Sequence, residues 1–169
     1  VDEWIRATQA ELLRSSDQAP LVVDLGFGAS PVTTIELYER LRDVRSDVEV
    51  MGLEIDPERV RRATEFQTRC GRLGDYRGLT FTCGGFELPV PRPPRLVRAF
   101  NVLRQYDEPA AWRAWERLCA GLEQEGLLIE GTCDEIGRRA TWVTLGRHAS
   151  GGNGPGQKPQ TGRSGCARP

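Results

Sequence analysis

Residues 21–31, LVVDLGFGASP, combine a strand pattern, a glycine turn and a helix start in one short stretch. The first five residues form an apolar run with an acid near its end, which is typical of a central buried strand. Gly26 and Gly28 follow, and a backbone without Cβ atoms at these positions lets a ligand approach closely. Ser30 can cap a helix whose first residue is Pro31. This stretch therefore predicts a strand, a loop and a helix.

The same alternation continues on both sides of this stretch and favours an α/β fold with a mostly parallel sheet. Residues 2–15 predict an opening amphipathic helix, because pairs of apolar residues recur two turns apart. The other strands are expected at 48–54, 79–83, 96–100, 127–130 and 140–145, and the other helices at 31–44, 57–68 and 107–126. Asp56 is expected to cap the second of these helices.

The length of 169 residues corresponds to about one domain. The chain has 23 basic and 24 acidic residues, a balance that does not support binding to nucleic acid. No apolar run is long enough for a membrane span, and the first residues lack the pattern of a signal peptide. These features predict a soluble, cytoplasmic protein. The arginines at 59, 61, 62 and 69 are expected to form a solvated helix face.

Residues 146–169 differ in composition from the body of the chain. They contain seven glycines and three prolines and lack large apolar side chains, so they cannot bury enough surface to offset the entropy of ordering. We expect a folded domain over 1–145 and a basic, disordered tail over 146–169. The composition leaves open whether the tail is native, a truncation product or an out-of-frame end.

Four kinds of site find little support in the sequence. A dinucleotide-binding G-x-G-x-x-G turn would need a third glycine at position 31, where Pro31 stands. A P-loop would need Gly-Lys-Ser/Thr after the turn, and this is absent. The five cysteines form no C-x-x-C pair and the only histidine, His148, lies in the tail, so no metal site or histidine triad is predicted.

The acid-x-Gly-x-Gly turn, together with GLEIDP at 52–57 on the next strand, resembles the class I S-adenosylmethionine-dependent methyltransferases over residues 21–145. The resemblance implies a three-layer, Rossmann-like α/β sandwich with S-adenosyl-L-methionine as cofactor. It also implies that Glu54 binds the ribose hydroxyls, since a carboxylate can accept from two vicinal hydroxyls at once. Asp24 and the two glycines would surround the methionine part.

Two positions depart from the family pattern. Ser30 stands where a third glycine is often found, and CGGFE at 83–87 lacks the acid that commonly holds the adenine amino group. Phe86 or Glu87 is left for that contact. The cofactor-binding residues expected from the resemblance are Asp24, Gly26, Phe27, Gly28, Glu54, Ile55, Phe86 and Asn101.

The catalytic residues are not identified by the sequence. Weak candidates follow the strand at 96–100, namely Asn101, Tyr106 and Asp107, with Arg104 as a further acceptor-orienting residue and Asp134 and Glu135 after the next strand. Val102 and Leu103 replace the prolines of the Asn-Pro-Pro-Tyr motif, so DNA methylation is unsupported. The expected activity is methyl transfer to an unidentified acceptor, with a small molecule favoured.

Two other functions remain open. The first is a non-catalytic or truncated module of the same fold, because the family's sheet normally finishes with a helix and an antiparallel hairpin beyond the last predicted strand. An uncovered sheet edge would then favour self-association into a homo-oligomer. The second is a nucleotide-dependent oxidoreductase, against which Pro31 argues.

Overall fold

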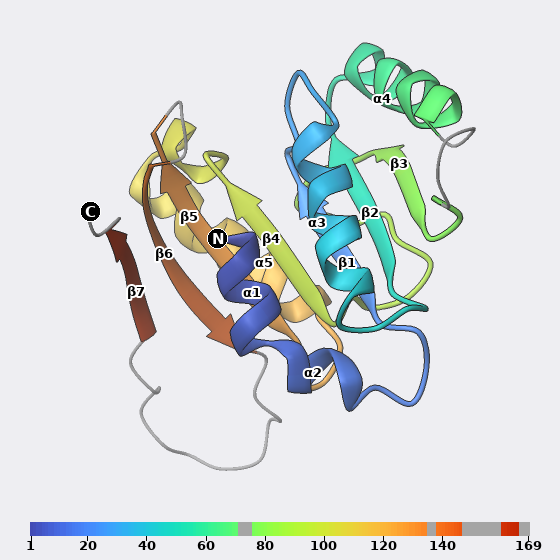
Figure 1. Cartoon of the computed structure of the whole chain (residues 1–169). Helices are drawn as coiled ribbons and strands as arrows, with labels where there is room; N and C mark the ends of the chain where they lie inside the picture. Colours follow the sequence, from blue (N-terminus) through green and yellow to red (C-terminus); the bar gives the residue numbers. More distant parts are fainter. Residues whose placement is uncertain (71–75, 135–137, 147–159, 166–169) are drawn as a thin grey trace.

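The protein is built around one sheet whose strands run in the order β3-β2-β1-β4-β5-β6-β7 (Figure 1). The computed structural model describes residues 1–70, 76–134, 138–146 and 160–165. The strands are β1 (Leu21–Leu25), β2 (Glu49–Glu54), β3 (Leu79–Cys83), β4 (Leu96–Phe100), β5 (Leu127–Cys133), β6 (Arg139–Gly146) and β7 (Gln160–Gly165). The first five are parallel, and β6 and β7 are added antiparallel. The direction of strand order changes between β1 and β4, where open α/β sheets bind ligands.

Helices cover both faces of this sheet. They are α1 (Asp2–Thr8), α2 (Ala10–Arg14), α3 (Val32–Arg42), α4 (Pro57–Cys70) and α5 (Glu108–Gly121), with a 3-10 turn η1 (Leu103–Gln105). One buried cluster joins the first four helices to the sheet through Ile5, Leu13, Leu37 and Ala63. The other packs Leu118 of α5 against Val97 of β4. The predicted three-layer α/β sandwich with a mostly parallel sheet is thus confirmed.

Element positions agree closely with the sequence patterns, apart from one helix start, one helix end and a break. Helix α5, expected over 107–126, ends at Gly121. The expected opening helix divides at Gln9 into α1 and α2, and both Ile5 and Leu13 are fully buried on either side of that break. Helix α3 begins at Val32 rather than Pro31. Pro31 takes the position before the helix, and the Ser30 hydroxyl accepts only a long bond, 3.4 Å, from the Val32 N–H.

The C-terminal segment also differs from expectation. Gln160–Gly165 pairs with β6 as the strand β7, with Thr141 opposite Arg163. Strand β6, expected to be the last of the sheet, therefore pairs with β5 on one side and with β7 on the other. The rest of the predicted disordered tail, 147–159 and 166–169, lies outside the described residues.

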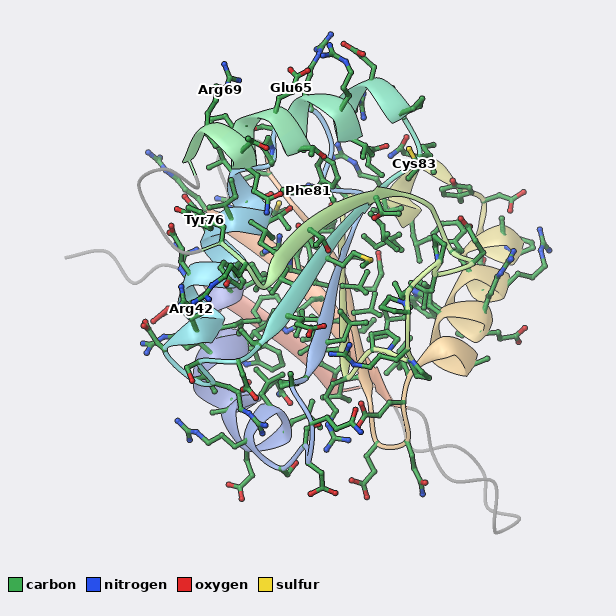
Figure 2. The ribbon with its side chains drawn as sticks, turned by 90° about the vertical axis from the view of Figure 1, so that its right-hand side faces the viewer. Arg42, Glu65, Arg69, Tyr76, Phe81 and Cys83 are labelled. Carbon is green, nitrogen blue, oxygen red and sulfur yellow. The ribbon has the colours of Figure 1, made fainter. Side chains whose placement is uncertain are left out.

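Helix α4 forms the outer layer beside β3, as Figure 2 shows with Glu65 and Arg69 on its surface. Arg61 and Arg62 donate to Glu58 and lower the pKa of that carboxyl to about 2. These arginines thus form the solvated face expected from the sequence. Within the described ranges, the helices lack the combination of length and apolarity that a membrane span needs.

The cap of α5 is the role that the structure gives to Asp107. Its carboxylate accepts from the Ala110 N–H at 2.8 Å, and Asp56 similarly accepts from the Glu58 N–H at 2.9 Å. We expect Asp107→Ala to lower the free energy of unfolding by about 1 kcal/mol, because an N-cap acceptor is lost. Asp107→Asn, which retains a good capping side chain, is the control. Urea denaturation measures both, and equal losses in the two variants would contradict the capping role.

A half-buried carboxyl on β5 makes the stability depend on pH. Glu130 lies on the same face of β5 as the buried Leu128, two positions away, and burial raises its pKa. Because its pKa is higher in the folded state, the protonated side chain favours folding relative to the ionised one. This stabilisation is fully present below the ordinary pKa near 4.5 and is lost as the pH rises through the folded-state pKa. Glu130→Gln should therefore stabilise the protein at pH 7 but not at pH 4. Thermal unfolding at the two pH values tests this, and a gain of equal size at both would contradict it.

Candidate functional site

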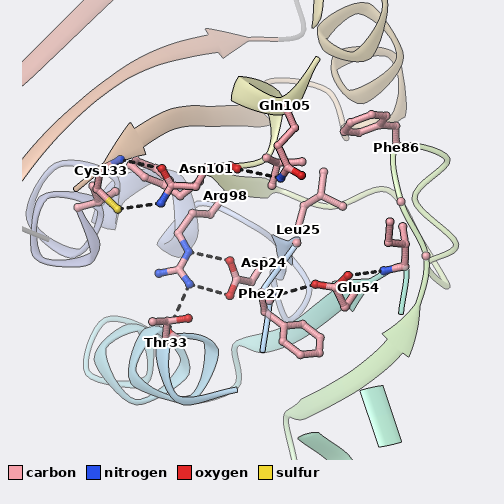
Figure 3. Close-up of a pocket in the computed structure, with 18 of the residues that line it drawn as sticks. Asp24, Leu25, Phe27, Thr33, Glu54, Phe86, Arg98, Asn101, Gln105 and Cys133 are labelled. Atoms are coloured by element: carbon pink, nitrogen blue, oxygen red, sulfur yellow. Dashed lines mark hydrogen bonds and ion pairs between the residues drawn. The ribbon is translucent and has the colours of Figure 1, made fainter. Parts of the chain in front are cut away.

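A cavity of about 810 Å³ opens at the carboxyl edge of the sheet, where the strand order changes direction. Its volume is in the range of small-molecule sites. Figure 3 shows that it collects residues from the ends of β1, β2, β4 and β5 and from the loop after β3. All eight residues expected to bind a cofactor line it: Asp24, Gly26, Phe27, Gly28, Glu54, Ile55, Phe86 and Asn101.

The two glycines after β1 serve different purposes. Both have positive φ, +72° at Gly26 and +77° at Gly28, which disfavours other residues. A Cβ at Gly26 would lie 2.6 Å from the Val102 Cγ2 atom, so this glycine is needed for packing against the β4 side. A Cβ at Gly28 would meet nothing within 4 Å. The backbone at Gly28 is thus accessible from the cavity.

Glu54 connects the end of β2 to this glycine turn. One carboxylate oxygen accepts from the Gly28 N–H at 2.9 Å, and the other accepts from the Ile55 N–H at 2.9 Å. The side chain is almost fully buried, and Arg59 of α4 approaches it at 3.5 Å. Arg59 therefore departs from the solvated face predicted for α4, since it also lines the cavity. Glu54 thus lines the cavity with a carboxylate whose two oxygens are both held by backbone N–H groups.

Asp24 forms a buried ion pair that the sequence did not indicate. Arg98 lies opposite it on β4, and its Nε and Nη2 atoms donate to the two carboxylate oxygens at 2.9 and 2.7 Å. The Thr34 hydroxyl donates to the same carboxylate at 2.6 Å. Asp24 and Arg98 are 3% and 6% exposed, so water has little access to this pair. Figure 3 shows both side chains at the cavity wall.

The charge of Arg98 is maintained by its partners. Burial of the guanidinium opposes the charged form, but the facing carboxylates of Asp24 and Asp2 outweigh this cost and raise the pKa of Arg98. Asp2 comes from α1, and Arg98 also donates to the Thr33 carbonyl at 3.3 Å. The only sequence signal for this residue was an arginine within the apolar strand LVRAF, 96–100.

Apolar side chains line the opposite end of the cavity. Ile55 is 75% exposed, unusual for a large apolar residue beside a cavity. Phe86, from the loop after β3, packs edge-to-face on Tyr106 with ring centroids 5.4 Å apart. Phe27 packs its ring against Phe81 of β3 in the core, so its side chain supports the turn. Glu87 also lines the cavity and accepts from the Gly85 N–H at 2.8 Å.

Asn101 ties β4 to β5 at the cavity floor. It has a positive φ of 61°, which asparagine tolerates better than most residues. Its side-chain oxygen accepts from the Cys133 N–H at 3.0 Å and the Thr132 hydroxyl at 2.9 Å. Its amide nitrogen approaches the Cys133 sulfur at 3.1 Å. Asn101 and Cys133 both line the cavity, and the asparagine holds the thiol in place.

The structure separates the other weak catalytic candidates. Tyr106 lines the cavity, whereas Asp107 is the cap of α5 and is absent from the described cavity wall. Arg104 is exposed in η1. Asp134 accepts from the Arg138 N–H at 2.7 Å, and Glu135 lies outside the described residues. Among the described residues, no group of three or more histidine, cysteine or acidic side chains is arranged to hold a metal ion.

The Asp24–Arg98 pair should contribute strongly to stability. Asp24→Asn leaves a buried guanidinium short of one carboxylate, and we expect a loss of about 3–5 kcal/mol in the free energy of unfolding. Asp47→Asn removes the same charge from an exposed pair with Arg45 and should have a small effect. Urea denaturation of the two variants compares them, and similar small losses would contradict a structural role for the buried pair.

The sequence matches no protein-family model and no curated protein. Solved structures do match it. A proposed sarcosine dimethylglycine methyltransferase of Galdieria sulphuraria is 21% identical, with a TM-score of 0.57 over 78% of this chain and 44% of its own. The mitomycin 7-O-methyltransferase MmcR is 20% identical, with a TM-score of 0.52 over 76% and 36%.

A magnesium protoporphyrin IX methyltransferase of Synechocystis with bound SAH is 19% identical, with a TM-score of 0.54 over 79% of this chain and 56% of its own. The chain thus spans roughly a third to somewhat over half of the length of these three proteins. Similarity at this level of identity establishes the fold. With its strand order and its glycine turn after β1, the chain has the fold of the class I S-adenosylmethionine-dependent methyltransferases.

Proposed function

We propose that the protein binds S-adenosyl-L-methionine in the cavity and transfers its methyl group to a small-molecule acceptor. The observation that carries this proposal is the placement of Glu54, whose carboxylate is fixed by backbone N–H groups beside the open backbone of Gly28. The structurally similar Synechocystis methyltransferase was solved once with SAH and once with SAM, which supports the same cofactor class here.

The residues along the cavity match the successive parts of this cofactor. The Glu54 carboxylate has acceptor capacity for the two ribose hydroxyls, since each oxygen can accept more than one hydrogen bond. Ile55 and Phe86 offer apolar surface for the adenine ring, and contact with a ligand would account for the exposure of Ile55. Asp24 and Gly26 also line the cavity and would face the methionine part.

The bound cofactor would supply a methyl group already activated by the positive sulfonium. The chain's own contribution is then to hold an acceptor in line and to exclude water. Phe100, Val102 and Tyr106 give the cavity an apolar wall beside Asn101. The bonds from Asn101 to β5 keep that wall rigid, which favours a fixed acceptor position.

Binding should depend on the Glu54 carboxylate. Glu54→Gln replaces an oxygen acceptor by a donor, and we expect S-adenosylhomocysteine to bind about 10- to 100-fold more weakly, the loss for one or two hydrogen bonds to a charged group. Glu49→Gln, at the other end of β2, makes the same chemical change outside the cavity and should bind normally. Calorimetric titration measures both, with the melting temperature as a check on folding. Equal affinities in the two variants would contradict the role of Glu54.

Methyl transfer is tested separately from binding. The chain is incubated with S-adenosylmethionine that carries a labelled methyl group and with mixtures of small-molecule amines, phenols, thiols and carboxylates. Label in an acceptor that depends on Glu54 supports the proposed activity. Binding without transfer to any acceptor favours the alternative, a non-catalytic ligand-binding module of this fold. Absence of binding by the folded protein would overturn the cofactor assignment.

A further inference from the structure

The cavity has one strongly charged end, which lies beneath α1. Three acids and two arginines line it: Asp2, Glu3, Asp24, Arg40 and Arg98. This end therefore carries positive and negative groups side by side. A ligand group of one sign only would meet repulsion there, whereas a group that carries both signs would find a partner for each.

The two acids that pair with Arg98 are held in different ways. Asp24 lies in the middle of the sheet and receives two hydrogen bonds from Arg98 and one from Thr34. Asp2 lies on the short helix α1 and is paired with the Nη1 atom of Arg98, while Arg40 approaches it at 3.5 Å. Its side chain is 17% exposed, compared with 5% for Asp24. Asp2 is therefore the more readily displaced of the two partners of Arg98.

The position of Asp2 resembles that of a bound carboxylate. It accepts from the Nη1 atom of a guanidinium whose other two nitrogens already donate to Asp24, and both Asp2 and Arg98 line the cavity. Guanidinium groups bind carboxylates with good geometry and strong charge-assisted bonds. A carboxylate from a ligand in the cavity could take the same place.

We propose that Arg98 is the receptor for the α-carboxylate of the bound amino-acid part of the ligand, and that Asp2 occupies this receptor in the free protein. This inference rests on the proposed function, since it assigns a residue to the methionine end of the same cofactor. Binding then exchanges one carboxylate on Arg98 for another. Asp2 acts as an internal competitor that lowers the apparent affinity for ligands with a carboxylate.

The test compares two ligands that differ in this carboxylate alone, S-adenosylmethionine and its decarboxylated form. Their affinity ratio isolates the carboxylate, because effects on the adenosine, the sulfonium and the amine apply to both ligands. We expect Asp2→Asn to raise this ratio roughly three- to tenfold, because the ligand no longer has to displace the Asp2 carboxylate from Arg98. Glu11→Gln on α2 removes the same charge outside the cavity and should leave the ratio unchanged.

Arg98 is tested by a second pair of variants. Arg98→Gln should bring the ratio close to one, and Arg98→Lys should restore part of the preference for the ligand with the carboxylate. If Arg98→Gln does not fold, the Asp2→Asn comparison decides by itself. A ratio that Asp2→Asn leaves unchanged or lowers would overturn the assignment, even when both ligands bind.

The two levels of the proposal fail in different ways. If the folded wild-type chain binds neither ligand, nor 5′-methylthioadenosine, the proposed function is wrong and this inference falls with it. The chain could instead bind all three ligands, with the same affinity ratio of S-adenosylmethionine to its decarboxylated form in wild type and Asp2→Asn. In that case the cofactor site stands and only the inference about Arg98 is wrong. Calorimetric titration at one fixed salt concentration provides all of these affinities.

Discussion

The ion pair between Asp24 and Arg98 holds the centre of the molecule together. It joins β1 to β4, the two strands between which the order of the sheet changes direction, and it is nearly inaccessible to water. A buried pair is tolerated only when its remaining hydrogen-bonding groups are satisfied. Here the Thr34 hydroxyl donates to the carboxylate, and the Asp2 carboxylate and the Thr33 carbonyl accept from the guanidinium. The pair therefore couples the sheet to both α1 and α3.

The cavity depends on this arrangement because its two sides are attached to the two halves of the sheet. Gly26 directly follows β1, the strand that carries Asp24. Its lack of a side chain makes room for Val102, which follows β4. On the other side, Glu54 binds the Gly28 backbone and so fixes the glycine turn to β2. The same carboxylate thus stabilises the glycine turn and lines the cavity. The buried acid is compatible with a stable fold because backbone N–H groups and Arg59 satisfy its carboxylate.

The cavity is chemically divided along its length. Its end near Ile55 and Phe86 is apolar and aromatic, its middle carries the Glu54 carboxylate, and its end under α1 carries charges of both signs. A nucleoside linked to an amino acid has the same sequence of properties. The match supports an adenosyl amino-acid ligand on grounds of chemistry that are independent of the fold comparison.

Most of the fold and much of the site follow from local sequence patterns. The strands at 79–83 and 96–100 and the glycine turn were predicted at their observed positions, because apolar runs and glycines at a turn are signals that neighbouring residues carry. The eight candidate cofactor residues are expected from the family resemblance, and they lie together at the cavity because parallel strands end at one edge of the sheet. Glu54 beside Gly28 is an example.

Other features depended on contacts between distant residues, and only the tertiary structure decided them. Asp2 and Arg98 are 96 positions apart, and nothing in either local pattern indicates that they meet. The bonds of Asn101 to Cys133 and the pairing of β7 with β6 likewise depend on which strands become neighbours. A sequence determines by itself which residues are apolar, flexible or charged. The packing of strands and helices decides which charges are buried together, because burial removes the water that would otherwise screen each of them separately.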